Sequence, residues 1–393
     1  MVDLDLKKLL IVYAAAFIGP FGGNAIIPLF GPIATALTTS IELASLSITF
    51  LMLPFAIMQF FSGTISDLFK RQHLCVIGLT IYGLGAILVG FSSSLELLLF
   101  ARGIQGIGYG VLFPVLVALL GDLSTQDQRG KVMGYFGVYT TAGVAFGPLC
   151  AGILVFYSWD LIFYITAAIA LVIGGFFWVI YRDFPSASKE KRKIGEFFSQ
   201  MKKTINWNIL LFSGIGFFIF LSYIGVNVSI GDRYTLLFAI PENDPRIALE
   251  TGIMLAFAGI SGILASAVAG LYINKIGRKK TAFIGVLVLG LSLSLFTFGN
   301  SLITFIVLFF CLGTGAAIFW TAYNTITVEL DPTAKGTVSS VSSGFRFFGY
   351  SLASPLYILL GLPMLYFVCT FIALIALGLL FLLRVARIVP PNQ

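Results

Sequence analysis

The stretch "LFARGIQGIGYGVLFPV", Leu99 to Val115, carries one arginine, Arg102, inside a run that is otherwise almost wholly apolar or glycine. An arginine at the centre of a lipid bilayer costs about 3 kcal/mol on insertion scales. Polar groups and water inside a helix bundle offset this cost. The stretch therefore predicts a membrane helix whose arginine faces the interior of a bundle.

The composition of the whole chain agrees with a membrane setting. Of its 393 residues, 58% are hydrophobic and 10% are charged, whereas soluble domains have about 25% charged residues. We therefore expect an all-α integral membrane protein. Apolar runs of about 20 residues cross a hydrocarbon core of about 30 Å as helices. Twelve such spans are predicted at residues 9–31, 42–66, 74–92, 95–120, 132–156, 159–181, 208–231, 249–273, 281–299, 302–328, 337–360 and 363–385.

The net charge of +7 is distributed as the positive-inside rule requires. If both termini lie on one side, only Arg233 and Arg246 fall on the other side, and Arg102 and Arg346 fall within spans. We therefore expect both termini in the cytoplasm and a multi-pass protein of the cell membrane. The basic balance is a topology signal and predicts no nucleic-acid partner.

A long polar connection, "RDFPSASKEKRKIGEFFSQMKKT" from Arg182 to Thr204, divides the spans six and six. We expect an N-terminal six-helix bundle at 1–181, a cytoplasmic linker at 182–207 and a C-terminal bundle at 208–393. Similar residues recur 207 positions apart in the two halves. The pairs are Gly63 with Gly270, Gly106 with Gly313, Gly108 with Gly315, Asp122 with Glu329, and Pro148 with Pro355. This recurrence indicates an internal duplication, with a substrate site near the midplane between pseudo-symmetric halves.

Two loop sequences at these positions resemble the signature of the major facilitator superfamily, and the resemblance covers essentially the whole chain. The first, "GTISDLFKRQ", keeps Gly63, Asp67 and Arg71 of the family's loop after the second span. The second, "GLYINKIGRK", keeps Gly270, Gly277 and Arg278 after the eighth. A carboxylate at a helix end can meet a basic side chain or the positive end of another helix. Asp67 is thus expected to stabilise one conformational state. For the basic residues of the loop, the alternative is that they only determine the membrane topology.

Two further stretches resemble the drug:proton antiporter branch of the superfamily. "RGIQGIGYG" carries Arg102, Gln105, Gly106 and Gly108 in the pattern of the fourth span. "GVAFGPLCAG" has the antiporter pattern of the fifth span, with Ala151 in place of one glycine. The pattern residues kept there are Gly143, Gly147, Pro148 and Gly152. Small residues with a proline favour a close-packed, bendable helix, and the resemblance implies an exporter.

The resemblance implies that Arg102, with Gln105, assists proton movement by biasing a carboxylate or an ordered water. An alternative is a structural arginine that binds backbone carbonyls or reaches the outer surface. The proton carrier itself is not evident, because no carboxylate lies mid-span. In the first span, "GPFGGNAIIP" has Gly19 where many proton-driven exporters of this branch carry an acid. The acids nearest to the spans are Glu42, Glu96, Asp232 and Glu250 at outer ends and Asp67, Asp122 and Glu329 at inner ends.

The family resemblance places the substrate cavity among the first, fourth, seventh and tenth spans. Its expected polar and aromatic lining residues are Asn24, Gln105, Tyr109, Tyr223, Asn227, Trp320, Tyr323 and Asn324. Arg346 in the eleventh span, "SSGFRFFGYSLASP", lies near mid-membrane and is added to this cavity. Arginine holds carboxylates and phosphates in a bidentate fork. Alternatively, neighbouring carbonyls or aromatic faces satisfy Arg346 within the packing.

The function predicted from these features is secondary active transport by alternating access, with proton-linked export of amphipathic compounds. The alternative is import or exchange of small organic anions, which the two buried arginines and the missing acid favour. We expect a small-molecule substrate and protons as partners, a monomer in the bilayer, and no enzyme activity, cofactor or metal. His73 is the single histidine, and no nucleophile or metal-ligand cluster is visible.

Overall fold

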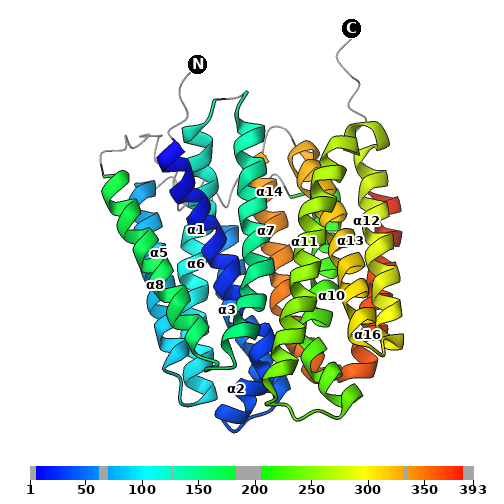
Figure 1. The fold of residues 1–393 in the computed structure, drawn as a ribbon. Helices are drawn as coiled ribbons and strands as arrows, with labels where there is room; N and C mark the ends of the chain where they lie inside the picture. Colours follow the sequence, from blue (N-terminus) through cyan, green and yellow to red (C-terminus); the bar gives the residue numbers. More distant parts are fainter. Residues whose placement is uncertain (1–5, 62–69, 126, 183–204, 332–334, 384–393) are drawn as a thin grey trace.

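The computed structural model describes residues 6–61, 70–125, 127–182, 205–331 and 335–383. Within these ranges the chain is helical and has no strands (Figure 1). The elements before the linker are α1 (Leu6–Asn24), η1 (Ile27–Leu29), α2 (Phe30–Ala36), α3 (Ile41–Phe60), α5 (Arg71–Gly90), α6 (Leu95–Leu123), α7 (Arg129–Leu154) and α8 (Leu161–Ile180). Those after it are α10 (Trp207–Phe238), α11 (Pro245–Ile276), α12 (Arg278–Leu295), η2 (Phe296–Phe298), α13 (Leu302–Leu330), α14 (Lys335–Ser351), α15 (Ala353–Leu360) and α16 (Leu362–Leu382).

Among the described residues, eleven helical segments are long and apolar enough to cross a membrane. They correspond to every predicted span except 337–360, which is built as two shorter helices, α14 and α15, with a break at Leu352. Pro355 has no N–H to donate to the carbonyl of Ser351 four residues earlier, and this loss interrupts the helix. The first span is also longer than predicted, because η1 and α2 extend it to Ala36. Gly63, Asp67 and most of the linker lie outside the described residues.

The packing of the helices repeats across the linker. In the first half α1 packs on α7 and α8, α3 on α6, and α5 on α6 and α8. In the second half α10 packs on α14 and α16, α11 on α13, and α12 on α13 and α16. The two sets of contacts are the same when each helix is replaced by its counterpart in the other half. The counterparts of α1, α3, α5, α6, α7 and α8 are α10, α11, α12, α13, α14 and α16. The duplication inferred from sequence is thus also present in the three-dimensional contacts.

Close glycine contacts follow the same 207-residue offset. A Cβ on Gly108 would meet the nitrogen of Tyr82 at 2.5 Å and the carbonyl oxygen of Gly78 at 2.8 Å. A Cβ on Gly315 would meet the nitrogen of Leu289 at 2.5 Å and the carbonyl oxygen of Gly285 at 2.9 Å. Both glycines therefore allow a helix pair to approach at backbone distance. This requirement explains why glycine stands at corresponding positions of both halves.

Two sets of contacts join the helices before the linker to those after it. One is α7 against α11, and the other is α3 against α14 and α15. The carbonyl of Ser351 that Pro355 frees accepts a hydrogen bond from the Thr49 hydroxyl at 2.6 Å. The Ser354 hydroxyl donates to the carbonyl of Ser45 at 2.8 Å. The proline break therefore supplies a bond between the halves, since an unpaired carbonyl in a low-dielectric interior is costly.

The contact between α7 and α11 is closest away from the termini. The start of α1 and the end of α16 lie on the same side of the bundle (Figure 1). On the opposite side, a Cβ on Gly152 would lie 2.6 Å from the carbonyl oxygen of Ala248, and one on Gly252 would lie 2.5 Å from that of Pro148. Toward the termini, no described atom lies within 4 Å of a Cβ on Gly137. The halves are therefore closed against each other on the side remote from the termini.

This asymmetry predicts the effect of one added methyl group. Gly252→Ala places a Cβ against the Pro148 carbonyl, so the closed side should separate and the equilibrium should shift toward a state open there, by about tenfold, or about 1.4 kcal/mol. Spin-label distances between cysteines placed at Tyr157 and Asn243, in a variant without the native cysteines, measure the shift. Gly137→Ala is the matched control and should leave the distances unchanged. Equal distance distributions in both variants would contradict the proposed closure.

Candidate functional site

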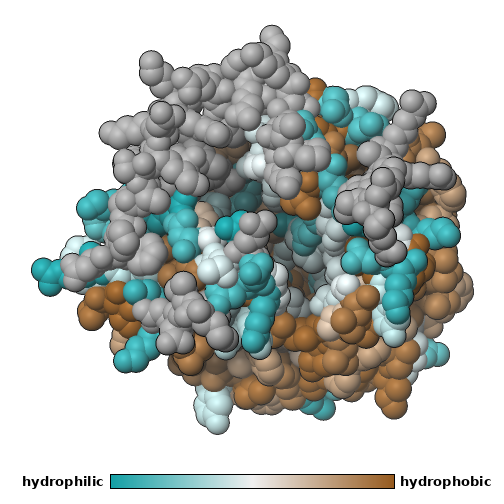
Figure 2. All heavy atoms as spheres, turned by 90° about the horizontal axis from the view of Figure 1, so that it is seen from above, coloured by the Kyte–Doolittle hydropathy of each residue, from teal (hydrophilic) through white to brown (hydrophobic). Residues whose placement is uncertain are grey.

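The face that carries the first and last described residues is hollowed at its centre (Figure 2). Pale and teal residues, of intermediate and hydrophilic hydropathy, surround the hollow, while brown apolar residues form much of the outer edge (Figure 2). In a membrane protein, such an arrangement exposes the apolar surface to lipid and keeps polar groups on a central water-filled space. The buried polar side chains between the two sets of helices are therefore the candidate site.

Arg102 on α6 is fully buried and is held by backbone carbonyls. Its guanidinium donates to Gly23 at 2.8 Å, to Gly22 at 3.3 Å and to Ser47 at 3.3 Å, and its Nη1 also donates to Gln105 Oε1 at 2.9 Å. The last carbonyls of a helix lack intrahelical partners, and α1 ends at Asn24. These hydrogen bonds therefore stabilise the buried charge of Arg102 and also satisfy carbonyl oxygens at the end of α1. These are the carbonyl bonds of the structural alternative, and the role of Arg102 in proton coupling stays a prediction.

Asn24 connects the broken end of α1 with α14 of the other half. Its side-chain nitrogen donates to the carbonyl of Pro20 at 2.8 Å. Its Oδ1 accepts a hydrogen bond from the Tyr350 hydroxyl at 2.7 Å. Both side chains are buried. The geometry thus places Asn24 at the junction of the two halves, where a change in their relative position would break the bond to Tyr350.

Arg346 on α14 has different surroundings from Arg102. Its guanidinium carbon lies 3.6 Å from the ring centroid of Trp320 on α13, 3.9 Å from that of Phe347 and 5.0 Å from that of Phe220 on α10. The side chain is 5% exposed, and its Nε is buried without a hydrogen-bond partner. We call Arg346, Trp320, Phe347 and Phe220 the arginine box. The box is an aromatic site with one unpaired cationic group.

The other predicted lining residues divide into two groups. Tyr109 and Tyr323 have packing roles, because Tyr109 stacks on Phe55 with ring centroids 4.4 Å apart and Tyr323 stacks on Phe212 at 4.3 Å. The Tyr323 hydroxyl also donates to the Ser342 carbonyl at 3.1 Å.

The second group consists of side chains that are partly accessible or carry an unpaired atom. Asn324 is exposed, and Tyr223 and Trp320 are half-buried. Asn227 is buried, and its Oδ1 has no hydrogen-bond partner. Phe220, Phe347 and Tyr350 were not among the residues predicted from sequence. The adjacency of Phe347 to Arg346 was the one available signal for the box.

The four pattern residues of α7 pack in two directions. Gly143 and Gly147 face α1, where an added Cβ would meet the backbone of Phe17 and Phe21. Pro148 and Gly152 face α11 of the other half, as described above. This helix therefore holds its own half together and forms the closed contact with the second half.

The basic residues of the two loop sequences make equivalent ion pairs. Arg71 at the start of α5 pairs with Asp122 at the end of α6. Arg278 at the start of α12 pairs with Glu329 near the end of α13 at 2.7 Å. The residues of the two pairs are related by the 207-residue offset. The first pair joins α5 to α6, and the second joins α12 to α13. Gly277 adopts φ 91°, a conformation that favours glycine, and Gly270 has no described neighbour within 4 Å of a Cβ.

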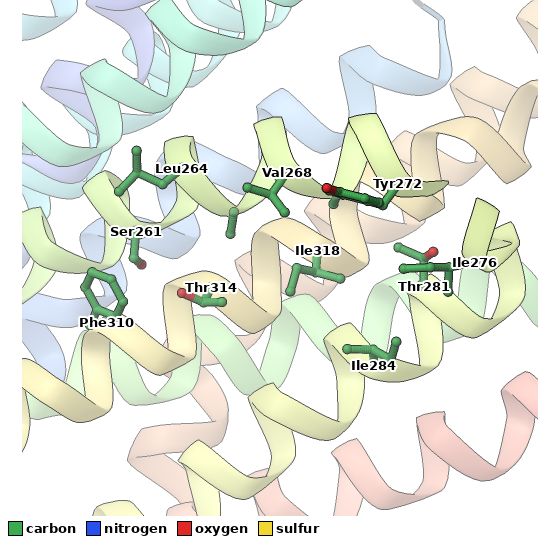
Figure 3. A pocket seen from close by; sticks show the side chains of 12 residues that line it. Ser261, Leu264, Val268, Tyr272, Ile276, Thr281, Ile284, Phe310, Thr314 and Ile318 are labelled. Atoms are coloured by element: carbon green, nitrogen blue, oxygen red, sulfur yellow. The ribbon is translucent and has the colours of Figure 1, made fainter. Parts of the chain in front are cut away.

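A second concave region lies on the outer surface of the later helices. It is a groove of about 360 Å³ between α11, α12 and α13, in which Leu264, Val268 and Tyr272 face Phe310, Thr314 and Ile318 (Figure 3). Leu264 and Val268 are more than half exposed, at 59% and 56%. The groove therefore opens toward the lipid rather than toward the hollow between the halves.

A family model described as Major Facilitator Superfamily matches residues 12–242 and 223–393, so the two matches together span nearly the whole chain. The chain belongs to the Major Facilitator Superfamily. Its membrane setting and its expected helical architecture are thereby confirmed.

Relatives of this superfamily protein include several named transporters. The chain is 32% identical to "Multidrug resistance protein 3" of Bacillus subtilis over 133 residues, or 34% of this chain and 26% of the relative. It is 24% identical to "Multidrug resistance protein 2" of the same organism over 264 residues, or 63% of each chain. It is 27% identical to "Citrate exporter 1" of Aspergillus niger over 152 residues, or 39% of this chain and 29% of the relative. The matched part thus spans between about a quarter and less than two thirds of these relatives.

Within the described residues of this superfamily protein, no group of three or more His, Cys, Asp or Glu side chains is placed to hold a metal ion. The described polar groups between the halves include the amide of Asn24, the hydroxyls of Thr49 and Tyr350, and the guanidinium of Arg102. Groups of this kind orient ligands in small-molecule pockets.

Substitution of the two buried arginines is expected to change the stability of this superfamily protein differently. Arg102→Gln leaves carbonyls unpaired and should lower stability by about 3–5 kcal/mol. Arg346→Gln removes a buried charge that lacks a hydrogen-bonded partner, so stability should be unchanged or higher. Apparent melting temperatures of the purified variants in one detergent measure this difference. Equal losses of stability in the two variants would show that Arg346 has a structural partner comparable to that of Arg102.

Proposed function

We propose that the protein works by alternating access, with residues 1–181 and 208–393 moving as two halves about a site between them. The repeated packing supports this division, because the contacts of α7 with α11 and of α3 with α14 are themselves related by the duplication. Two-fold related halves can exchange which end of their interface is closed. In the present conformation the side remote from the termini is closed and the hollow opens on the other face (Figure 2).

The function that we propose is the export of amphipathic compounds from the cytoplasm. The observation that carries this proposal is the arginine box between α10, α13 and α14, with the open polar groups of Asn227 and Asn324 on two of the same helices. An aromatic pocket with a few polar groups binds molecules that are apolar in one part and polar in another. The printed names of two Bacillus relatives, multidrug resistance proteins 2 and 3, support the same function.

We place the termini and the open face in the cytoplasm because of the positive-inside distribution of Lys and Arg. A substrate would then enter from the cytoplasm and leave when the opposite end opens. Import or exchange of a small organic anion is the second candidate. The unpaired guanidinium of Arg346 and the name of the fungal relative, a citrate exporter, favour it.

We propose Asp232 on α10 as the proton carrier. Its carboxylate accepts a hydrogen bond from the Tyr357 hydroxyl of α15 at 2.5 Å. Glu42 of α3 and Glu242 of the connection after α10 interact with it electrostatically, and Arg233 is its chain neighbour. Tyr366 of α16 also interacts with this carboxylate. Asp232 therefore lies where the two halves meet on the closed side, and its protonation would change the charge at that contact.

Transport in inside-out vesicles tests both parts of this proposal. With a more acidic interior, a fluorescent amphiphile should accumulate inside, and one pH unit supplies about 1.4 kcal/mol per proton, enough for about tenfold accumulation. Asp232→Asn should abolish accumulation while equilibration of the amphiphile continues. Glu96→Gln, which changes an exposed acid at the first turn of α6, is the matched control. Accumulation by Asp232→Asn at the wild-type level would remove Asp232 as the carrier, and no protein-dependent movement of any amphiphile would reject export itself.

A further inference from the structure

The charge of Arg346 has no compensating group of the usual kind within the described part of the chain. Its Nε is buried and unpartnered, and its terminal nitrogens donate no hydrogen bond to a described residue. None of the ion pairs among the described residues includes Arg346. Cation–π contacts with the box recover only part of the cost of burying a cation.

At Arg102 the fold provides hydrogen-bond acceptors for a buried guanidinium. Four hydrogen bonds hold that residue, three of them to carbonyls from α1 and α3. Arg346 is buried almost as completely, at 5% exposure, yet it keeps its donors free. A buried polar group without a partner in a native structure requires an explanation, and a ligand that supplies the missing acceptor is one.

The box also departs from the internal symmetry of the chain. The position 207 residues before Arg346 is Tyr139, which stacks on Tyr13 with ring centroids 5.1 Å apart. The opposite half presents Phe55, whose ring contacts Phe347 at 4.5 Å, and Tyr109, which stacks on Phe55. The cation and the rings that contact it therefore come from one half, and the aromatic side chains of the other half adjoin them through Phe347. This geometry suits a molecule with one anionic end and an apolar body.

We propose that the arginine box binds the anionic group of the substrate, so that the compounds exported are amphipathic anions. The guanidinium receives two oxygens of a carboxylate, sulfonate or phosphate in its planar fork. Trp320 and Phe220 hold the guanidinium plane, and the apolar part of the substrate lies against the aromatic side chains of both halves. The inference rests on the proposed export function and names its substrate class.

Binding to the full-length protein in nanodiscs tests this assignment with two probes that share one aromatic body, 1-pyrenebutyrate and 1-pyrenebutanol. The wild type should bind the carboxylate at least tenfold more tightly than the alcohol. Arg346→Gln should reduce that preference to less than threefold while leaving the affinity for the alcohol unchanged, and Arg346→Lys should keep part of the preference. Arg129→Gln removes the same charge from an exposed arginine at the start of α7 and is the matched control, in which the preference should persist.

Three results would overturn the assignment. The first is equal affinity of the wild type for both probes, and the second is loss of the preference in Arg129→Gln as well, which would indicate long-range attraction only. The third is competition by citrate or inorganic phosphate as strong as that by pyrenebutyrate, which would assign the box to small hydrophilic anions. Vesicle export separates this inference from the proposed function. If the alcohol is exported without dependence on Arg346, the proposed export function stands and the assignment of the box to anions falls. If binding depends on Arg346 but no probe is exported, the assignment stands and the export function falls.

Discussion

Every backbone carbonyl in the membrane interior needs a donor, and this constraint organises the structure around its two broken helices. Proline and glycine residues end α1 at Asn24 and interrupt the eleventh span at Leu352. Each break leaves carbonyls without intrahelical partners. At the first break Arg102 supplies the donors, and at the second the Thr49 hydroxyl does. Because these donors come from other helices, the breaks become the points at which the bundle is held together.

The same constraint gives the two buried arginines different roles. Backbone carbonyls and the Gln105 side chain accept the hydrogen bonds of Arg102, so the fold itself compensates this buried charge. Arg346 is surrounded by rings that attract its charge but accept no N–H donor. The Nε of Arg346 is therefore a buried donor without an acceptor, and the proposed substrate would supply that acceptor.

The duplication shows which features occur in both halves and which occur in one half only. The close glycine contacts and the ion pairs Arg71 with Asp122 and Arg278 with Glu329 occur in both halves at the same offset. They hold helices together within each half, and moving halves need such rigidity equally. Arg102 and Arg346 have aromatic residues, Phe309 and Tyr139, at the corresponding positions. The two buried arginines are thus not part of the repeat.

The sequence by itself determined the membrane setting, the helical class, nearly all of the spans and the repeat, because hydrophobic length and a fixed residue offset are properties of the chain in one dimension. It also singled out Arg102 and Arg346, since a charge within an apolar run needs an explanation wherever it is placed. Only the tertiary structure decided what each arginine touches, because Gly22, Ser47, Trp320 and Phe220 are far from them along the chain. It also decided which side of the interface is closed and that Arg71 pairs with Asp122. These features depend on how helices distant in sequence meet, and no local pattern of residues specifies that geometry.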